Sequence, residues 1–163
     1  MKKYWLVLFI AGLVMSVVGA DPHIRKSVTA ILDGNEVTLR YVTVPINMDH
    51  VAEVGTGDFR RGASLKVGGD LQAGETSIAA GEYTVGCIRD GADAWTMVLY
   101  PGRLGRQENP DRSKLITLDS IFSMDRGSVD HVSFDIEPGS GSLNRRAVVV
   151  WRFGDLYLAG ALT

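Results

Sequence analysis

Two consecutive arginines beside an aromatic residue form the pattern in this sequence that most directly indicates ligand chemistry. They lie in the segment GDFRRGAS, where Phe59 is surrounded by Asp58, Arg60, Arg61 and Ser64. A guanidinium can bind a carboxylate or phosphate through two parallel hydrogen bonds, and an aromatic ring can form one wall of such a pocket. The alternative is structural: one arginine stacks on the ring and pairs with the aspartate, which pins a loop.

The histidines offer a second kind of chemistry. His23, His50 and His131 show neither H-x-H nor H-x-x-x-H spacing. A transition-metal site needs three or four converging ligands, and Asp130 and His131 would point to opposite faces of one strand. We therefore expect no metal site and no cofactor.

Sequence motifs of the common enzyme classes are missing. The chain has no G-x-S-x-G, no H-E-x-x-H and no phosphate-binding glycine loop before a helix. We assign no catalytic residue on this basis. One enzymatic alternative stays open, a small hydrolase or isomerase that uses His23 with an acidic partner and Arg60 as an oxyanion clamp. The candidate ligand-binding residues are His23, Asp58, Phe59, Arg60, Arg61 and Ser64.

The single cysteine, Cys87, lies in an apolar strand pattern and cannot form an internal disulfide. A lone cysteine in such a pattern is typically a small buried hydrophobic residue. The alternative is a reactive thiol, but no histidine is next to it in the sequence to activate it. We predict that this thiol is buried and unreactive.

The elements that must position these residues are strands. After residue 20, apolar residues alternate with polar ones between glycine, aspartate, asparagine and proline, and helical periodicity is nearly absent. Residues 33–35, DGN, predict a hairpin turn between two β-branched runs, and a second hairpin is predicted to turn at Gly154-Asp155. The pattern predicts an all-β fold: a single-domain antiparallel β-sandwich with Greek-key connections over residues 21–163.

The alternation also predicts which side chains face the core. They are Val37, Leu39, Tyr41, Tyr83, Val85, Cys87, Trp95, Met97, Leu99, Val132, Phe134 and Ile136. The run Val148 to Val150 does not alternate, which predicts a strand that is covered on both faces or lies at the centre of the sandwich. Residues 45–63 and 101–114 resist strand assignment and are predicted to be long polar loops, the first of which contains both adjacent arginines.

The first twenty residues predict export. Lys2 and Lys3 precede an apolar run that ends in the small residues of Val18-Gly19-Ala20, the pattern of a signal peptide of residues 1–20 cleaved after Ala20. The alternative is an uncleaved membrane anchor, but residues 4–20 as a helix would span roughly 25 Å, short of a hydrocarbon core of about 30 Å. We expect a periplasmic or secreted protein with no membrane association after cleavage.

Charge narrows the range of partners. The formal net charge is −2, and cleavage would remove Lys2 and Lys3 and leave −4. An acidic chain of this kind has nothing to attract nucleic acid or an anionic membrane surface. The partners we expect are a small molecule, a glycan or a protein, and the function we expect is that of a non-catalytic binding or structural module.

Several segments together resemble one protein family. The run DPHIRKSVTAILDGNEVTLRY resembles the opening of the secreted bacterial proteins of domain-of-unknown-function family 2911, and FRRGAS at 59–64 is similar to their Trp-Arg-Thr-Gly-Ala-Asn segment. GDLQAGETSIAAGEYTV and WTMVLYPG follow in the order of the family. The resemblance implies an exported β-sandwich without an established activity. The matching residues are Pro22, His23, Arg60, Gly62 and Ala63, and the departures are Asp21, Phe59, Arg61 and Ser64.

We predict that the exported protein begins at Asp21, because small residues precede it at the end of the apolar run. Intact-mass analysis of the protein recovered from the periplasm or the medium should give the mass of residues 21–163. A mass that retains residues 1–20 would contradict the prediction.

Overall fold

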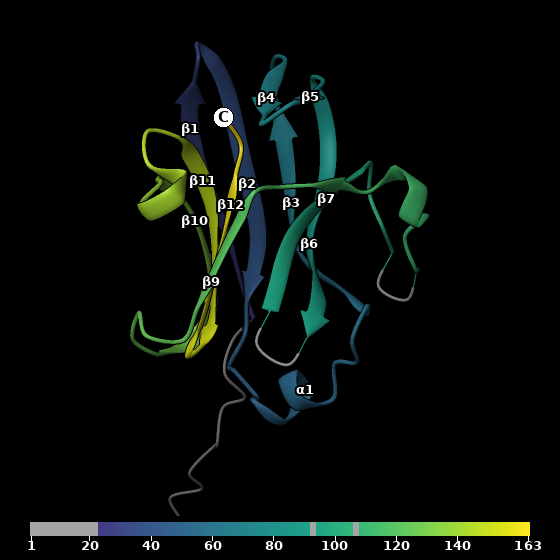
Figure 1. Ribbon diagram of the computed structural model, residues 1–163, viewed down its shortest axis with the longest axis vertical. Helices are drawn as coiled ribbons and strands as arrows, with labels where there is room; N and C mark the ends of the chain where they lie inside the picture. The colour runs from purple at the N-terminus through teal and green to yellow at the C-terminus, as the bar shows by residue number, and fades with distance from the viewer. Residues whose placement is uncertain (1–22, 92–93, 106–107) are drawn as a thin grey trace, which may run out of the picture.

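Most of the described part of the chain forms β-strands (Figure 1). The computed structural model describes residues 23–91, 94–105 and 108–163. The predicted signal peptide therefore lies outside the described residues. Within the described ranges, no helix has the length and apolar character needed to cross a membrane.

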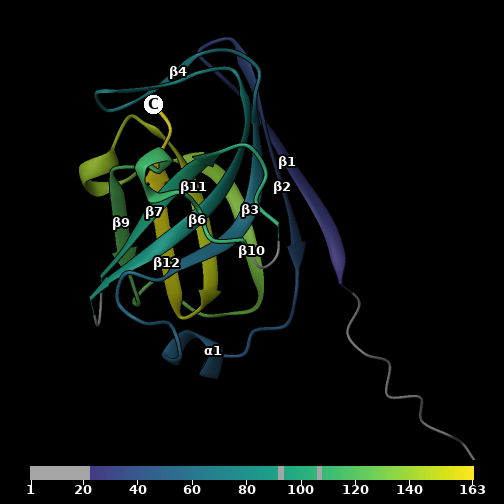
Figure 2. The same ribbon diagram turned by 90° about the vertical axis from the view of Figure 1, so that its right-hand side faces the viewer.

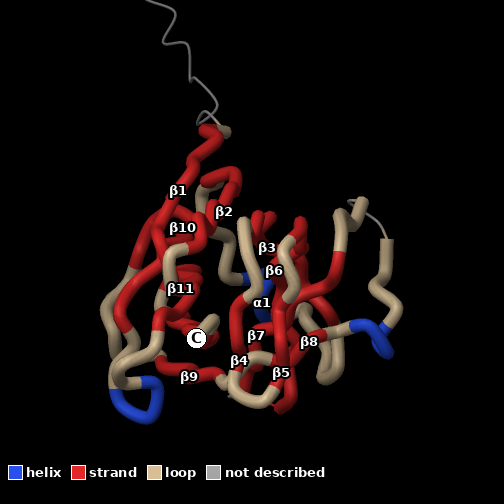
Figure 3. Tube along the Cα trace, turned by 90° about the horizontal axis from the view of Figure 1, so that it is seen from above, coloured by secondary structure: helices blue, strands red, loops and turns tan. Residues whose placement is uncertain are grey.

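Two antiparallel sheets pack face to face, as Figure 3 shows from above. The strands of the larger sheet, in spatial order, are β1 (Ile24–Leu32), β2 (Asn35–Thr43), β3 (Phe59–Val67), β6 (Gly81–Gly91), β7 (Ala94–Pro101) and β8 (Ile116–Thr117). Those of the smaller sheet are β10 (Val129–Pro138), β11 (Ala147–Gly154), β12 (Leu156–Ala161) and β9 (Ser120–Ser123). In the smaller sheet β9 lies beside β12 although it precedes β10 in the chain, which is a Greek-key order. The predicted all-β sandwich is thus confirmed.

Short elements complete the described chain. They are the small hairpin of β4 (Leu71–Ala73) and β5 (Thr76–Ile78), helix α1 (Asp49–Ala52), and the 3₁₀ turns η1 (Arg112–Lys114) and η2 (Gly141–Leu143). Helix α1 lies below one open end of the sandwich, and β1 lies at the outer edge of the molecule (Figures 1 and 2). The two predicted hairpin turns are confirmed, the first with positive φ at Asp33 and Gly34 and the second with positive φ at Gly154.

The hydrophobic core lies between the sheets and contains the side chains that the alternation predicted. Most of the predicted set is buried, whereas Trp95 and Ile136 are half-buried and pack against the core. Val149 belongs to this core, while Val148 and Val150 lie on the other face of β11 in a second cluster with Leu143 of η2. The prediction that this run is covered on both faces is confirmed.

The two sheets are tied together at both edges. At one edge, the amide of Val132 in β10 donates to the carbonyl of Val44, just beyond β2, at 3.0 Å. At the other edge, the chain passes from the larger sheet to the smaller one at residues 118–119. There the amide of Leu118 donates to the carbonyl of Met97 in β7, and the amide of Ala161 in β12 donates to the carbonyl of Asp119, both at 3.0 Å.

The predicted loop of residues 45–63 is wrong over its last five residues, because β3 begins at Phe59. Residue Arg61 pairs with Gly86, and Ala63 pairs with Val85, so Gly62 is an extra residue in β3. Such a β-bulge shifts the alternation of the strand by one residue. Because of this shift, the apolar residues of β3 do not alternate without interruption, and the sequence pattern did not identify the strand. The second predicted loop, residues 101–114, is confirmed over its described residues, since within them no strand follows the end of β7 at Pro101 and the last three residues form the 3₁₀ turn η1.

The two sheets approach one another closely at Gly62. A Cβ atom at this position would lie 2.4 Å from Phe134 Cζ and 2.9 Å from Trp151 Cη2. The centroids of these two rings are 4.8 Å apart, and the Phe134 ring is 5.3 Å from that of Tyr41 in β2. The missing side chain of Gly62 therefore allows an aromatic cluster from both sheets to close over β3.

We predict that Gly62→Ala lowers the free energy of unfolding by about 1 to 3 kcal/mol, because the methyl group overlaps two core rings. Gly91→Ala is the matched control, since the nearest atom of a described residue to its added Cβ, Ala94 Cβ, is 4.0 Å away. Urea unfolding of both variants measures the difference. Equal stability of the two variants would show that the rings are not held against Gly62.

Candidate functional site

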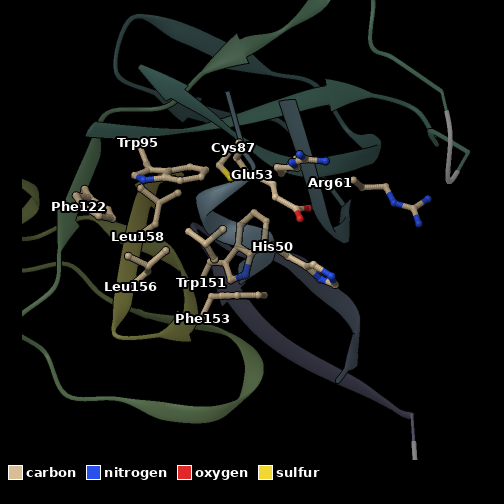
Figure 4. Close-up of a pocket in the computed structure, with 13 residues that line it drawn as sticks. His50, Glu53, Arg61, Cys87, Trp95, Phe122, Trp151, Phe153, Leu156 and Leu158 are labelled. Carbon is tan, nitrogen blue, oxygen red and sulfur yellow. The ribbon is translucent and has the colours of Figure 1, made fainter. Parts of the chain in front are cut away.

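A cavity of about 330 Å³ opens between the two sheets at the end covered by α1 (Figure 4). Its volume lies at the small end of the range for ligand pockets. The cavity is lined by His50, Val51, Glu53, Val54, Arg60, Arg61, Cys87, Trp95, Phe122, Trp151, Phe153, Leu156 and Leu158. Aromatic and aliphatic side chains from both sheets form its walls, and its charged groups come from α1 and β3.

The segment that carries α1 is fixed to β6 and so forms a stable border of the cavity. The side chain of Val54 is buried, and its carbonyl accepts a hydrogen bond of 2.6 Å from Nη1 of Arg89. The amide of Gly57 donates to the carbonyl of Arg89 at 2.7 Å. The Arg89 guanidinium also lies 5.7 Å from the ring centroid of Trp95, a cavity wall. One arginine thus connects the border of the cavity to its wall.

The bulge at Gly62 decides which of the adjacent arginines faces the cavity. Arg60 pairs directly with Cys87, and residues opposite one another in an antiparallel pair have their side chains on the same face. Cys87 belongs to the core, so Arg60 also projects to the inner face. Its side chain is exposed at the mouth and makes no hydrogen bond or ion pair with the described residues.

Arg61 takes the opposite direction and has a structural partner. Its Nη1 donates a hydrogen bond of 2.7 Å to the carbonyl of Leu104, in the loop that follows β7. The amide of Leu104 donates in turn to the hydroxyl of Thr84 in β6 at 3.0 Å. Although Arg61 borders the cavity, its guanidinium fixes a loop across the outer face of the sheet.

The structure separates Phe59 from the apolar cavity. The Phe59 ring lies on Gly86 on the outer face of the larger sheet, where an added Cβ would be 2.2 Å from Phe59 Cε2. A second, polar hollow of about 450 Å³ is lined by Asp58, Phe59, Arg60, Asn109, Pro110 and Arg112. Arg60 therefore lines both the apolar cavity and the polar hollow. Only in the polar hollow does it lie with Phe59, the aromatic wall predicted from the sequence.

The other sequence candidates, Asp58, Ser64 and His23, lie outside the apolar cavity. Asp58 accepts a hydrogen bond of 2.8 Å from the amide of Gly55 and closes a turn, and it makes no ion pair with Arg60. The hydroxyl of Ser64 donates to the carbonyl of Arg40 at 3.4 Å. His23 is exposed and lies immediately before β1. Neither His23 nor Ser64 lines either concavity, so the structure does not bring His23 and Arg60 into one pocket.

Sequence reasoning missed the aromatic walls from the smaller sheet. Trp151 and Phe153 of β11, together with Phe122 of β9, line the cavity. The indole Nε1 of Trp151 is buried and has no hydrogen-bond partner in the described part of the chain. A buried indole N–H normally has a partner. The missed sequence feature was the concentration of aromatic residues in WRFG, just before a predicted hairpin turn.

Cys87 is buried, as predicted, with 4% of its surface exposed. Burial raises the pKa of its thiol well above the ordinary value, and the nearby charge of Arg60 opposes this effect only in part. The thiol therefore stays protonated at neutral pH and is a weak nucleophile. Within residues 23–91, 94–105 and 108–163, no group of three or more histidine, cysteine, aspartate or glutamate side chains is arranged to hold a metal ion.

Comparisons of the chain with protein-family models, with curated proteins and with solved structures gave no match. The resemblance to domain-of-unknown-function family 2911 therefore stays a prediction. The site has to be interpreted from its own geometry.

We predict that Cys87 makes the protein less stable as the pH rises above about 8.5, the ordinary thiol pKa. The raised pKa keeps the folded thiol protonated while the unfolded thiol ionises, so the folded state binds more protons and loses stability by at most about 1.4 kcal/mol per pH unit. Urea unfolding between pH 8 and 10 should show a steeper fall for wild type than for Cys87→Ala. Parallel slopes would contradict a buried, protonated thiol.

Proposed function

We propose that the protein is an exported, non-catalytic binding module that takes a small, largely apolar molecule into the cavity between its two sheets. The first twenty residues support export, because they have the pattern of a signal peptide. The cavity supports binding, since a concave apolar site with a few polar groups at its border is the common form of a small-molecule site.

The observation that carries the proposal is the composition of the cavity walls. Trp95 and Trp151 contribute from opposite sheets, and Phe122, Phe153 and Leu158 extend the apolar surface between them. Large apolar side chains usually fill the space between the sheets of a sandwich. Here they leave about 330 Å³ unfilled beside an open mouth. An apolar ligand would bury this surface and recover about 25 cal/mol for each Å² removed from water.

The placement of the histidines favours binding over catalysis. His23, the base of the alternative hydrolase or isomerase, lines neither concavity. His50 borders the cavity, but it makes no side-chain hydrogen bond with a described carboxylate that would orient it as a general base. The buried thiol of Cys87 is held in its protonated form. Among residues 23–91, 94–105 and 108–163, none of these groups has an activating partner of the kind that nucleophilic catalysis requires.

Tryptophan fluorescence gives a direct test, because Trp95 and Trp151 are the only tryptophans after residue 20 and both line the cavity. The uncharged probe 3-phenyl-1-propanol should change the emission of residues 21–163 in a saturable way. Val51→Phe, which enlarges a side chain at the cavity border, should weaken binding by about tenfold, equivalent to about 1.4 kcal/mol.

Val42→Phe is the matched control for this substitution. Val42 is 42% exposed on β2 and does not line the cavity, so the same change there should leave the affinity unaltered. Absence of saturable binding to wild type, or equal weakening by both variants, would overturn the proposed function.

A further inference from the structure

We infer that the ligand of this cavity carries a carboxylate group, which Arg60 binds at the mouth while the apolar body lies between Trp95 and Trp151. The inference rests on the proposed function, because it assigns the chemistry of a ligand for the same cavity. It would make the protein a receptor for small amphipathic acids.

Arg60 has the properties of a ligand-binding cation. Its position opposite Cys87 directs it to the inner face of the sheet, and it lines both concavities. Arg61 and Arg89 bind backbone carbonyls with their guanidinium groups. Arg60 makes no such bond with the described residues, so its N–H donors are available to a bound molecule.

The chemistry of the cavity favours a carboxylate on an apolar body over a wholly polar anion. A guanidinium presents two parallel donors that match the two oxygens of a carboxylate. Below this cation the walls are aromatic and aliphatic, and they offer little to solvate a polyol or a second charged group. A guanidinium at the mouth of an apolar cavity therefore fits a carboxylate attached to an apolar frame.

Glu53 is the opposing charge at the mouth. It follows α1, lines the same cavity and is exposed, and it makes no ion pair with Arg60. A ligand carboxylate bound at Arg60 would therefore be weakly repelled by Glu53, and a ligand ammonium would be attracted to it. Neutralising Arg60 and neutralising Glu53 should therefore change the affinity for a charged ligand in opposite directions. The direction of each change reports the sign of the ligand charge.

Three probes with one carbon skeleton test the inference: 3-phenylpropionate, 3-phenyl-1-propanol and 3-phenylpropylammonium. Binding of each to residues 21–163 is measured by calorimetry and tryptophan fluorescence. We expect the carboxylate to bind at least about tenfold more tightly than the alcohol, and the ammonium to bind more weakly than the alcohol. Added salt should weaken binding of the carboxylate and leave that of the alcohol unchanged.

The variants separate Arg60 from general electrostatics. Arg60→Gln should reduce carboxylate affinity about tenfold or more and leave alcohol affinity and the melting temperature unchanged. Glu53→Gln should raise carboxylate affinity about two- to fivefold. Arg103→Gln removes an exposed cation that lines neither concavity, and it should have no effect on any probe.

The outcomes distinguish the two proposals. If the alcohol binds saturably but the carboxylate binds no better, or if Arg60→Gln weakens both probes equally, the carboxylate inference is overturned and the apolar cavity remains a binding site. Preferential binding of the ammonium, weakened by Glu53→Gln, would also overturn it. If no probe binds to wild type, both proposals fail together.

Discussion

The contact of Phe134 and Trp151 with the bare backbone of Gly62 is the constraint on which the arrangement of this protein depends. The rings belong to the smaller sheet and the glycine to the larger one, and no side chain at residue 62 would fit between them. The same glycine is the extra residue of a β-bulge, so it shifts by one residue the alternation of inward and outward side chains along β3. Gly62 therefore accounts both for the close packing of the sheets and for the inward direction of Arg60.

Most of the fold follows from local sequence patterns, because side chains of a strand alternate between faces with a period of two. This rule placed Val37, Leu39 and Val85 in the core, and it predicted the burial of Cys87. Turn chemistry was equally local: Asp33 and Gly34 adopt the positive φ that a tight hairpin needs. The tolerance of glycine and aspartate for positive φ is a property of the residues themselves, so the turn can be predicted without knowing which strands pair.

The candidate site was less predictable, because it depends on contacts between distant strands. A bulge exists only relative to a partner, and the sequence FRRGAS does not reveal that Arg60 lies opposite Cys87 while Arg61 lies opposite Gly86. The sequence draws attention to the arginine pair, but its two members project to opposite faces of β3. The cavity could not be predicted from the sequence either, because it also depends on how the two sheets pack. Trp151 and Phe153 look like core residues of a strand, and only the packing of the sheets shows that space remains beside them.

An unfilled apolar cavity and an unpartnered buried N–H are both costs to stability. Unfilled volume forfeits packing contacts, and a buried polar group without a partner costs about 1 to 3 kcal/mol. Such local departures from optimal packing are expected at functional sites. The hydrogen bond from Val132 to Val44 and the crossing of the chain at residues 118–119 tie the sheets together at their edges, and the cavity lies between the sheets that they join.

A crystal structure of residues 21–163 grown with 3-phenylpropionate tests the central claim most directly. The account predicts density for the phenyl ring between Trp95 and Trp151, with the carboxylate within hydrogen-bond distance of the Arg60 guanidinium. An inter-sheet space closed by its own aromatic side chains, or a probe bound only outside the sandwich, would contradict it.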